Sequence, residues 1–288
     1  MKGGSHVGQA RQTVERLQLG LALQRLRTKA GRSQQEAADL IGRSAPRLSQ
    51  VENGKGALDS AELTRLLDFY GVQGEERATL LELGKASRRR QPRAGYVDAL
   101  PNSFPRLMDL LSAARRISWY ECGIIPGLVQ AKSYVEAAIG ANTAVRSEAA
   151  ERIAFRLEMQ QQVLTSTAEQ INIVFTEDSL LHVVGDDSVM RRQALHLLEL
   201  MEQHSTLNIR IVPMGAVNNP GNGGGLIALE FLKAEPVTFA STIYGPSTYY
   251  DQASFTEPMR QLFEQIQDLA YNVQDTRAAL IDLLGAPD

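Results

Sequence analysis

Residues 33–55 read SQQEAADLIGRSAPRLSQVENGK, and this stretch decides the fold of the first third of the chain. Two short helices are predicted, because Ser33 and Ser44 both favour the N-cap position. Glu36 follows Ser33 at the spacing of a capping box. Gly42 suits the turn between the helices, since a positive φ costs glycine nothing. Only a short turn fits there, which is typical of the helix pair that a DNA major groove accepts.

The second helix of this pair carries a polar outward face. Leu48 and Val51 are its inward positions, and Pro46 falls in the first turn, where the missing N–H does no harm. The sequence Asn53-Gly54 ends the helix. The residues expected on or near the outward face are Arg43, Ala45, Pro46, Arg47, Ser49 and Gln50.

Further helices are predicted on both sides of the pair, and the five together make an all-α domain over residues 13–85. Their apolar residues recur at helical spacing, and Gly31 and Gly71 end two of them. The flanking helices are expected at residues 13–30, 59–69 and 74–85. Apolar residues expected inside the domain include Ala37, Leu40, Ile41, Ala78, Leu81 and Leu83.

Across residues 15–83 the chain resembles the lambda-repressor-like, or XRE, helix-turn-helix family. The resemblance implies a sequence-specific DNA-binding domain with a buried ion pair between Arg27 and Glu52. The alternative is a helical bundle that binds protein, since some protein-binding modules share this geometry. The matching residues are Leu26-Arg27, Gly31, Ser33-Gln34, Glu36, Ala38, Ile41-Gly42 and the run Leu48-Ser49-Gln50-Val51-Glu52-Asn53-Gly54-Lys55.

The residue types on this surface predict separate kinds of contact with double-stranded DNA. Gln50 is placed for a bidentate contact to an adenine edge, and Arg47 or Arg43 for a guanine or a phosphate. Ala45 and Pro46 offer apolar contact, which is expected to go to a thymine methyl group. Phosphates are expected to be held by Gln34, Asn53 and Lys55, and the predicted DNA-binding set is completed by Ser44 and Ser49.

Charge is divided unevenly along the 288 residues. Residues 1–95 hold 17 Lys and Arg against 10 Asp and Glu, whereas the remainder holds 13 against 23. A basic first domain for phosphates and an acidic second domain are therefore expected. No apolar run reaches the ~18–20 residues that cross a bilayer. No secretion signal is recognised, and the single cysteine excludes an internal disulfide, so a cytoplasmic protein is expected.

An Arg-rich linker is predicted at residues 86–101, followed by a second domain at 102–288. This domain is expected to be α/β, with a mixed sheet and many helices. The segments 170–175 and 207–212 read as parallel strands joined by a helix at 188–204. Other strands are expected at 116–121, 226–233 and 237–244, and other helices at 105–114, 148–164, 177–183, 257–270 and 275–284.

The second domain also resembles the actinobacterial WhiJ-like regulators, some of which are described as antitoxin-like proteins paired with a small partner protein. The resemblance covers residues 90–284, and Met159 and Ala131 depart from it. Its residues are Ile125-Pro126-Gly127-Leu128-Val129-Gln130, Tyr134, Arg152, Arg156, Gln160, Glu177-Asp178, Leu181, Val184-Gly185, Met190-Arg191, Gln193 and Ile211-Val212-Pro213.

Evidence for catalysis in the second domain is weak, so no enzyme, cofactor or metal site is predicted. The acidic residues Glu177, Asp178, Asp186 and Asp187, with His182 nearby, match no known ligand spacing and suit helix starts instead. The loop 221–225 lacks the ending of a phosphate-binding loop. Cys122 and His196 are interpreted as core or interface residues.

The sequence is compatible with three functions. The first is a transcriptional regulator, dimeric on a pseudopalindromic operator, whose second domain dimerises and senses a small molecule or partner protein. The second is an antitoxin-like protein that binds a small partner protein and regulates its own operon. The third is a small-molecule enzyme that carries a DNA-binding domain. Ligand docking is expected near the segments 124–130 and 215–225, and dimerisation through the helices at 148–164, 188–204 and 257–284.

Overall fold

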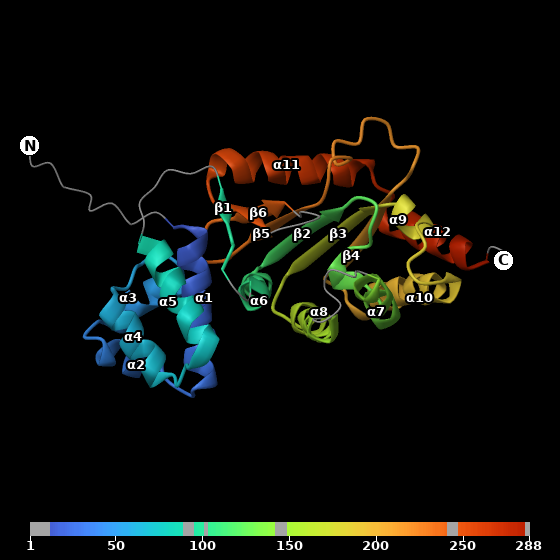
Figure 1. The fold of residues 1–288 in the computed structure, drawn as a ribbon. Coiled ribbons are helices and arrows are strands. Elements are labelled where there is room, and N and C mark those ends of the chain that lie inside the picture. The colour runs from blue at the N-terminus through green and yellow to red at the C-terminus, as the bar shows by residue number, and fades with distance from the viewer. Residues whose placement is uncertain (1–11, 89–94, 101–102, 142–148, 241–246, 286–288) are drawn as a thin grey trace, which may run out of the picture.

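The computed structural model describes residues 12–88, 95–100, 103–141, 149–240 and 247–285, which form a helical bundle followed by an α/β part (Figure 1). The two-part architecture confirms the predicted fold class. The bundle consists of α1 (Val14–Lys29), α2 (Gln34–Leu40), α3 (Ala45–Glu52), α4 (Ser60–Phe69) and α5 (Gly74–Arg88).

Local capping signals set two of these helix starts. The Ser33 hydroxyl accepts a hydrogen bond from Glu36 N at 3.2 Å, and the Glu36 carboxylate accepts one from Ser33 N at 2.7 Å. Asp59 and Glu62 form the same reciprocal capping box at the start of α4. Ser44 occupies the N-cap position of α3 as predicted, but its side chain makes no capping hydrogen bond.

Two of the predicted inward residues are wrong. Leu40 is 38% exposed, and Ala38 is buried instead. On α5, Ala78 is exposed, whereas Leu80 is buried. Successive helical residues lie roughly 100° apart around the axis, so a small error of phase moves a side chain from the core to the surface.

The second part of the chain forms a mixed sheet covered by helices. Its strands are β1 (Tyr96–Val97), β2 (Arg116–Glu121), β3 (Gln170–Thr176), β4 (Leu207–Val212), β5 (Leu226–Glu230), β6 (Val237–Ala240) and β7 (Thr248–Tyr250). Its helices are α6 (Ser103–Ala113), the 3-10 turn η1 (Gly127–Val129), α7 (Lys132–Gly140), α8 (Ala149–Leu164), α9 (Asp178–Leu181), α10 (Asp187–Gln203), α11 (Ala253–Leu269) and α12 (Val273–Gly285).

The strands follow the order β1-β7-β6-β5-β2-β3-β4. The central strand β2 is parallel to β3 and antiparallel to β5, and β3 is parallel to β4. This arrangement confirms the predicted parallel pair, and β5 pairs with β6 in the antiparallel direction. The carboxyl ends of β2, β3 and β4 therefore meet at one edge of the sheet.

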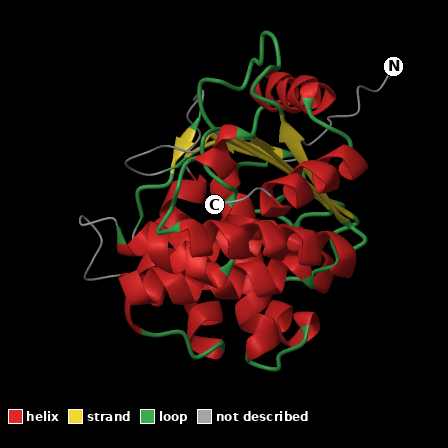
Figure 2. Ribbon diagram, turned by 90° about the vertical axis from the view of Figure 1, so that its right-hand side faces the viewer, coloured by secondary structure: helices red, strands yellow, loops and turns green. Residues whose placement is uncertain are grey.

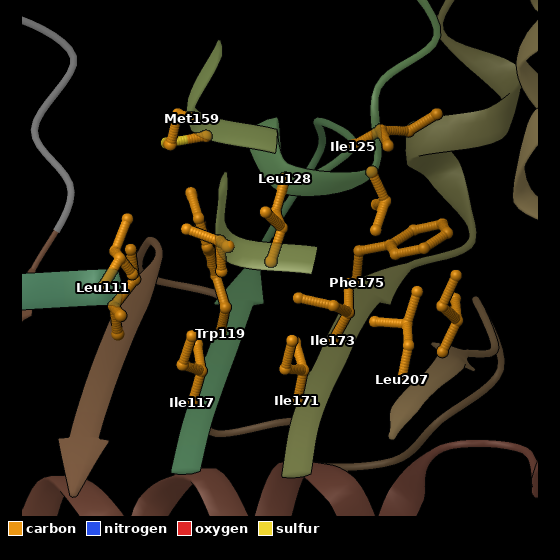
Figure 3. Close-up of a cluster of buried hydrophobic side chains, with 14 of the residues drawn as sticks. Leu111, Ile117, Trp119, Ile125, Leu128, Met159, Ile171, Ile173, Phe175 and Leu207 are labelled. Atoms are coloured by element: carbon orange, nitrogen blue, oxygen red, sulfur yellow. The ribbon is translucent and has the colours of Figure 1, made fainter. Parts of the chain in front are cut away.

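Helices lie on both faces of the sheet (Figure 2). On one face, Tyr120, Val174 and Val212 form a core cluster with Phe263 and Ile266 of α11. The opposite face carries the larger core, which includes buried residues of α6, α8, α10 and η1. Figure 3 shows this core, where Ile125, Leu128 and Met159 lie over a strand layer that includes Ile117, Trp119, Ile171, Ile173 and Phe175.

Several boundaries differ from the prediction. The range 86–101 contains the end of α5 and strand β1, which pairs with β7. The N-cap of α10 is Asp186, so this helix begins at Asp187, one residue before the predicted start. Residues 241–244 of a predicted strand and residues 89–94 of the predicted linker lie outside the described residues. Where the chain is described, no helix combines the length and apolarity needed to cross a membrane.

The first helix of the bundle also packs against the α/β part. Val14 and Leu17 of α1 belong to the larger core of the second part. Polar contacts reinforce this packing, because Val14 N donates to Asp251 at 2.9 Å and Arg25 Nε donates to Asp109 Oδ1 of α6 at 2.8 Å. The bundle is thus joined to the α/β part through α1.

Candidate nucleic-acid interface

The outward face of α3 is accessible, as a recognition helix requires. Leu48 and Val51 are buried and anchor α3 in the bundle. On the opposite side Pro46, Arg47 and Gln50 are exposed. The other predicted DNA-binding residues on and beside this helix are also accessible, with Ser44 and Lys55 exposed and Arg43, Ala45, Ser49 and Asn53 half-buried.

The turn before α3 has the tight geometry of a helix-turn-helix. Gly42 has a φ of +71°, which lies in the region that side chains rarely adopt. Arg43 N then donates to Ala38 O at 2.9 Å, which closes the end of α2. A Cβ on Gly42 would meet no atom within 4 Å, so the glycine is needed for backbone conformation rather than for space.

A polar network fixes α3 relative to α1 and α2. Arg27 Nε and Nη2 donate to the two carboxylate oxygens of Glu52 at 2.7 and 3.1 Å. Glu52 is only 2% exposed, so the predicted buried pair is confirmed. The hydrogen bond to Glu52 raises the pKa of Arg27. Gln34 Nε2 also donates to Glu52, at 2.7 Å, which places the first residue of α2 against the last residue of α3.

Arg43 is held by an ion pair that the sequence did not predict. Its guanidinium donates to both carboxylate oxygens of Glu62, at 2.5 and 2.7 Å. Glu62 also serves as the capping residue of α4, so one carboxylate connects the turn to the next helix. The guanidinium of Arg43 is therefore engaged within the bundle, which leaves Arg47 as the arginine of this face that is open to a DNA base.

The two long polar side chains of α3 contact each other. Arg47 Nη1 donates to Gln50 Oε1 at 2.9 Å, and both residues are exposed. Asn53 Nδ2 instead donates to Ser49 O at 2.6 Å and caps the end of the helix. Gly54, with a φ of +73°, turns the chain so that Lys55 follows on the surface.

A close contact between α1 and α3 sets how deeply α3 lies in the bundle. The residue that permits this contact was not predicted from the sequence. A Cβ on Gly20 of α1 would lie 2.4 Å from Val51 O and 2.6 Å from Glu52 O. Only glycine allows α1 to approach the carboxyl end of α3 so closely. The sequence does indicate it, because Gly20 lies inside a helical pattern, and a glycine at such a position usually permits close packing of another element.

In the α/β part, the residues of the second resemblance converge on the loop 125–131. Gln160 Nε2 donates to Gly127 O and Gln130 O, both at 2.8 Å. Gln193 accepts from Ala131 N at 2.7 Å and donates to Val129 O at 2.9 Å. These side chains come from α8 and α10, so they tie the loop after β2 to both helices.

The other polar residues considered for chemistry are dispersed. Asp186 caps α10 and accepts from Val189 N at 3.0 Å. Burial lowers the pKa of His196, and Cys122 is half-buried and not in a disulfide. No group of three or more His, Cys, Asp or Glu side chains in the described ranges is arranged to hold a metal ion.

Comparison with known families identifies both parts. A family model described as "Helix-turn-helix domain" matches residues 18–80. A second, described as "Domain of unknown function (DUF5753)", matches residues 104–282, which is more than half of the chain. Among curated proteins, no sequence matches. The first match supports an XRE-like helix-turn-helix regulator, and the second assigns no activity to the C-terminal part.

Proposed function

We propose that this chain, which belongs to the family defined by the domain of unknown function DUF5753, is a sequence-specific DNA-binding transcriptional regulator. The observation that carries the proposal is the exposed polar face of α3, formed by Arg47 and Gln50 on a helix whose other side is locked into the bundle. The tight turn at Gly42 connects α2 to α3 as in a helix-turn-helix, whose second helix enters the major groove.

The exposed side chains of α3 supply the base contacts. Gln50 pairs with the N6 and N7 edge of an adenine, and Arg47 reaches the O6 and N7 edge of a guanine or a phosphate. In the structure these two side chains also hydrogen-bond to each other. Ala45 and Pro46 contact a thymine methyl group. Arg43, held by Glu62, positions the turn.

The residues that border α3 hold the DNA backbone. Lys55 offers a cation to a phosphate, and Ser44, Ser49 and Asn53 offer shorter polar groups beside it. Gln34 lies at the start of α2, where backbone N–H groups also point at an anion. Its bond to Glu52 fixes the distance between this phosphate contact and the base-reading face.

A homodimer would provide the affinity that one short helix lacks. Two recognition helices about 34–36 Å apart read half-sites one DNA turn apart. The apolar faces of α8 and α11 lie against the sheet, and an accessible apolar edge remains between α10 and α12, where Leu195 is 45% and Ile281 is 53% exposed. Hydrogen bonds from Arg191 to Leu284 O and from Arg277 to Glu202 frame this edge. We assign the dimer contact to it.

An antitoxin-like role is the second candidate, and a cluster of exposed apolar residues favours it. The loops after β2, β3 and β4 lie together, because Gly123 N donates to Thr176 and Met214 N donates to Glu177. Such a patch on an acidic domain suits a small basic partner protein with an apolar contact face. The exposed residues are Ile124, Leu181, Val183, Met214 and Val217.

Selection of random-sequence DNA by the full-length protein tests the primary function. The proposal expects a two-fold symmetric consensus with half-sites one turn apart. Failure to enrich any sequence at low salt would contradict it. Copurification of the full-length protein with the product of a small adjacent gene would favour the antitoxin-like role, and the two results can be obtained independently.

A further inference from the structure

Arg156 of the α/β part is half-buried and forms no ion pair with a described residue. Arg156 of α8 lies against the loop 125–131, and its guanidinium is so close to the backbone that a Cβ on Gly127 would lie 2.0 Å from Nη1. Its hydrogen bond goes to a neutral amide, from Nη1 to Gln130 Oε1 at 3.0 Å. Among the described residues, no carboxylate lies within ion-pair distance of this guanidinium.

Three other buried or half-buried arginines of this chain have carboxylate partners. Arg27, Arg43 and Arg106 each donate to a carboxylate, at 2.7, 2.5 and 2.6 Å. A guanidinium removed from water is costly unless an anion compensates it. Burial lowers the pKa of Arg156, and the charge of Glu121 only partly opposes that effect. Among the described residues, the side chain of Arg156 therefore has a neutral amide as its hydrogen-bond partner, and Glu121 acts on it only through its charge.

Arg156 lies beside the carboxyl end of a central strand of the sheet. The loop 125–131 follows the carboxyl end of β2, where α/β domains often bind ligands. On both sides of this strand end, a glycine lets the backbone approach a charged side chain closely. Gly127 lies against the guanidinium, and a Cβ on Gly225 would lie 2.0 Å from Glu121 Oε2. The glycine-rich segment before β5 thus reaches the same strand end as the loop 125–131.

A path of direct contacts connects this place to the DNA-binding bundle. Phe155, next to Arg156 on α8, stacks on Phe104 of α6 with ring centroids 4.7 Å apart. Asp109 of α6 then accepts from Arg25 of α1 at 2.8 Å, and Arg25 also donates to Glu76 of α5 at 3.2 Å. These contacts link α8 to α6, and α6 to α1 and α5 of the bundle.

We propose that Arg156 anchors a binding site for the carboxylate or phosphate group of a small anionic molecule, between the loop 125–131 and the carboxyl end of β2. A planar guanidinium with free N–H groups binds both anions in a forked geometry. The proposal adds a ligand-sensing role for the C-terminal part to the proposed regulator function. It does not depend on DNA binding.

Thermal unfolding of the full-length protein tests the site with simple anions. Melting temperatures are measured in sodium phosphate, in sodium malonate and in sodium chloride of matched ionic strength, for the wild type, Arg156→Met, Arg156→Lys and Arg260→Met. Arg260 of α11 is 36% exposed and pairs with Glu257 and Glu264 on the surface, so its replacement is the control. Comparison between variants cancels the general stabilisation that phosphate gives to any protein.

The proposal expects a saturable rise in melting temperature for the wild type and for Arg260→Met in phosphate or malonate. The anion whose curve saturates identifies the chemical source. Arg156→Met is expected to lose this rise while melting no lower than the wild type in chloride, and Arg156→Lys to keep part of it. An equal rise in Arg156→Met, no saturable rise in the wild type, or a large loss of stability in chloride for both Arg156 variants would overturn the proposal. None of these results involves DNA, so they leave the proposed regulator function standing.

Discussion

The guanidinium of Arg27 and the carboxylate of Glu52 form a two-bond ion pair that ties α1 to the last residue of α3. Side-chain exposures of 13% and 2% place this pair largely out of water. Because Gln34 donates to the same carboxylate, the pair fixes three helices of the bundle at once. The orientation of the recognition helix therefore depends on it.

Replacing Arg27 by methionine is expected to lower the free energy of unfolding by about 3–5 kcal/mol, since Glu52 would be left as a buried and uncompensated charge. Urea titration of the full-length protein measures the effect. Arg77→Met is the matched control, because Arg77 pairs with Asp68, which is 62% exposed, and such a pair contributes about 0–1 kcal/mol. Equal losses in the two variants would contradict the account.

Gly20→Ala is expected to destabilise the protein by roughly 1–3 kcal/mol, because the new Cβ would overlap the carbonyl oxygens of Val51 and Glu52. Gly140→Ala serves as the control, since no atom lies within 4 Å of a Cβ at that helical position. Thermal melts of both variants give the comparison. A Gly20→Ala protein as stable as Gly140→Ala would show that α1 and α3 are farther apart than described.

Glu36→Gln is expected to change how the stability depends on pH. Hydrogen bonds from the Ser33 side chain and backbone lower the pKa of Glu36, so the folded state favours the ionised form. The contribution is present above the ordinary pKa of glutamate and is lost as the pH falls through the lowered value. Melting temperatures of both proteins between pH 7 and pH 3 should converge toward the acid end. A constant difference over this range would exclude the charged capping box.

Leu195→Glu is expected to turn a dimer into a monomer, because the new charge would be buried at the proposed contact between α10 and α12. The mass of the full-length protein in solution at micromolar concentration gives the answer, with Leu232→Glu as a control at a leucine that is 72% exposed on another surface. A wild type that is itself monomeric would remove the basis for the proposed dimer.

The sequence predicted the features that depend on neighbouring residues. Contacts between distant residues were predicted only where a resemblance or a strand–helix–strand order indicated them, as for Arg27 with Glu52 and β3 with β4. The capping box at Ser33 and the turn at Gly42 are local, so their spacing was sufficient. Strands β1 and β7 are two and three residues long, too short to produce an alternating pattern. The pairing of Arg43 with Glu62 joins residues 19 positions apart, which no local pattern indicates.

The loop 125–131 is a motif that the sequence revealed without its structural reason. Its residues were recognised as a motif, but the reason for the motif lies in Gln160 and Gln193, up to 64 positions away along the chain. The resemblance grouped these residues without giving their roles. Their hydrogen bonds to the loop backbone, and the placement of Arg156 beside it, became evident only in three dimensions.

The most direct test of the central claim is the binding of Gln50→Ala to the operator selected by the wild type. The account predicts a loss of about 1–3 kcal/mol at one adenine of each half-site, with relaxed preference at that position and unchanged preference elsewhere. Gln261→Ala, an exposed glutamine of α11, should bind as the wild type does. A Gln50→Ala protein that binds the operator as tightly and as selectively as the wild type would contradict the assignment of α3 as the helix that reads the sequence.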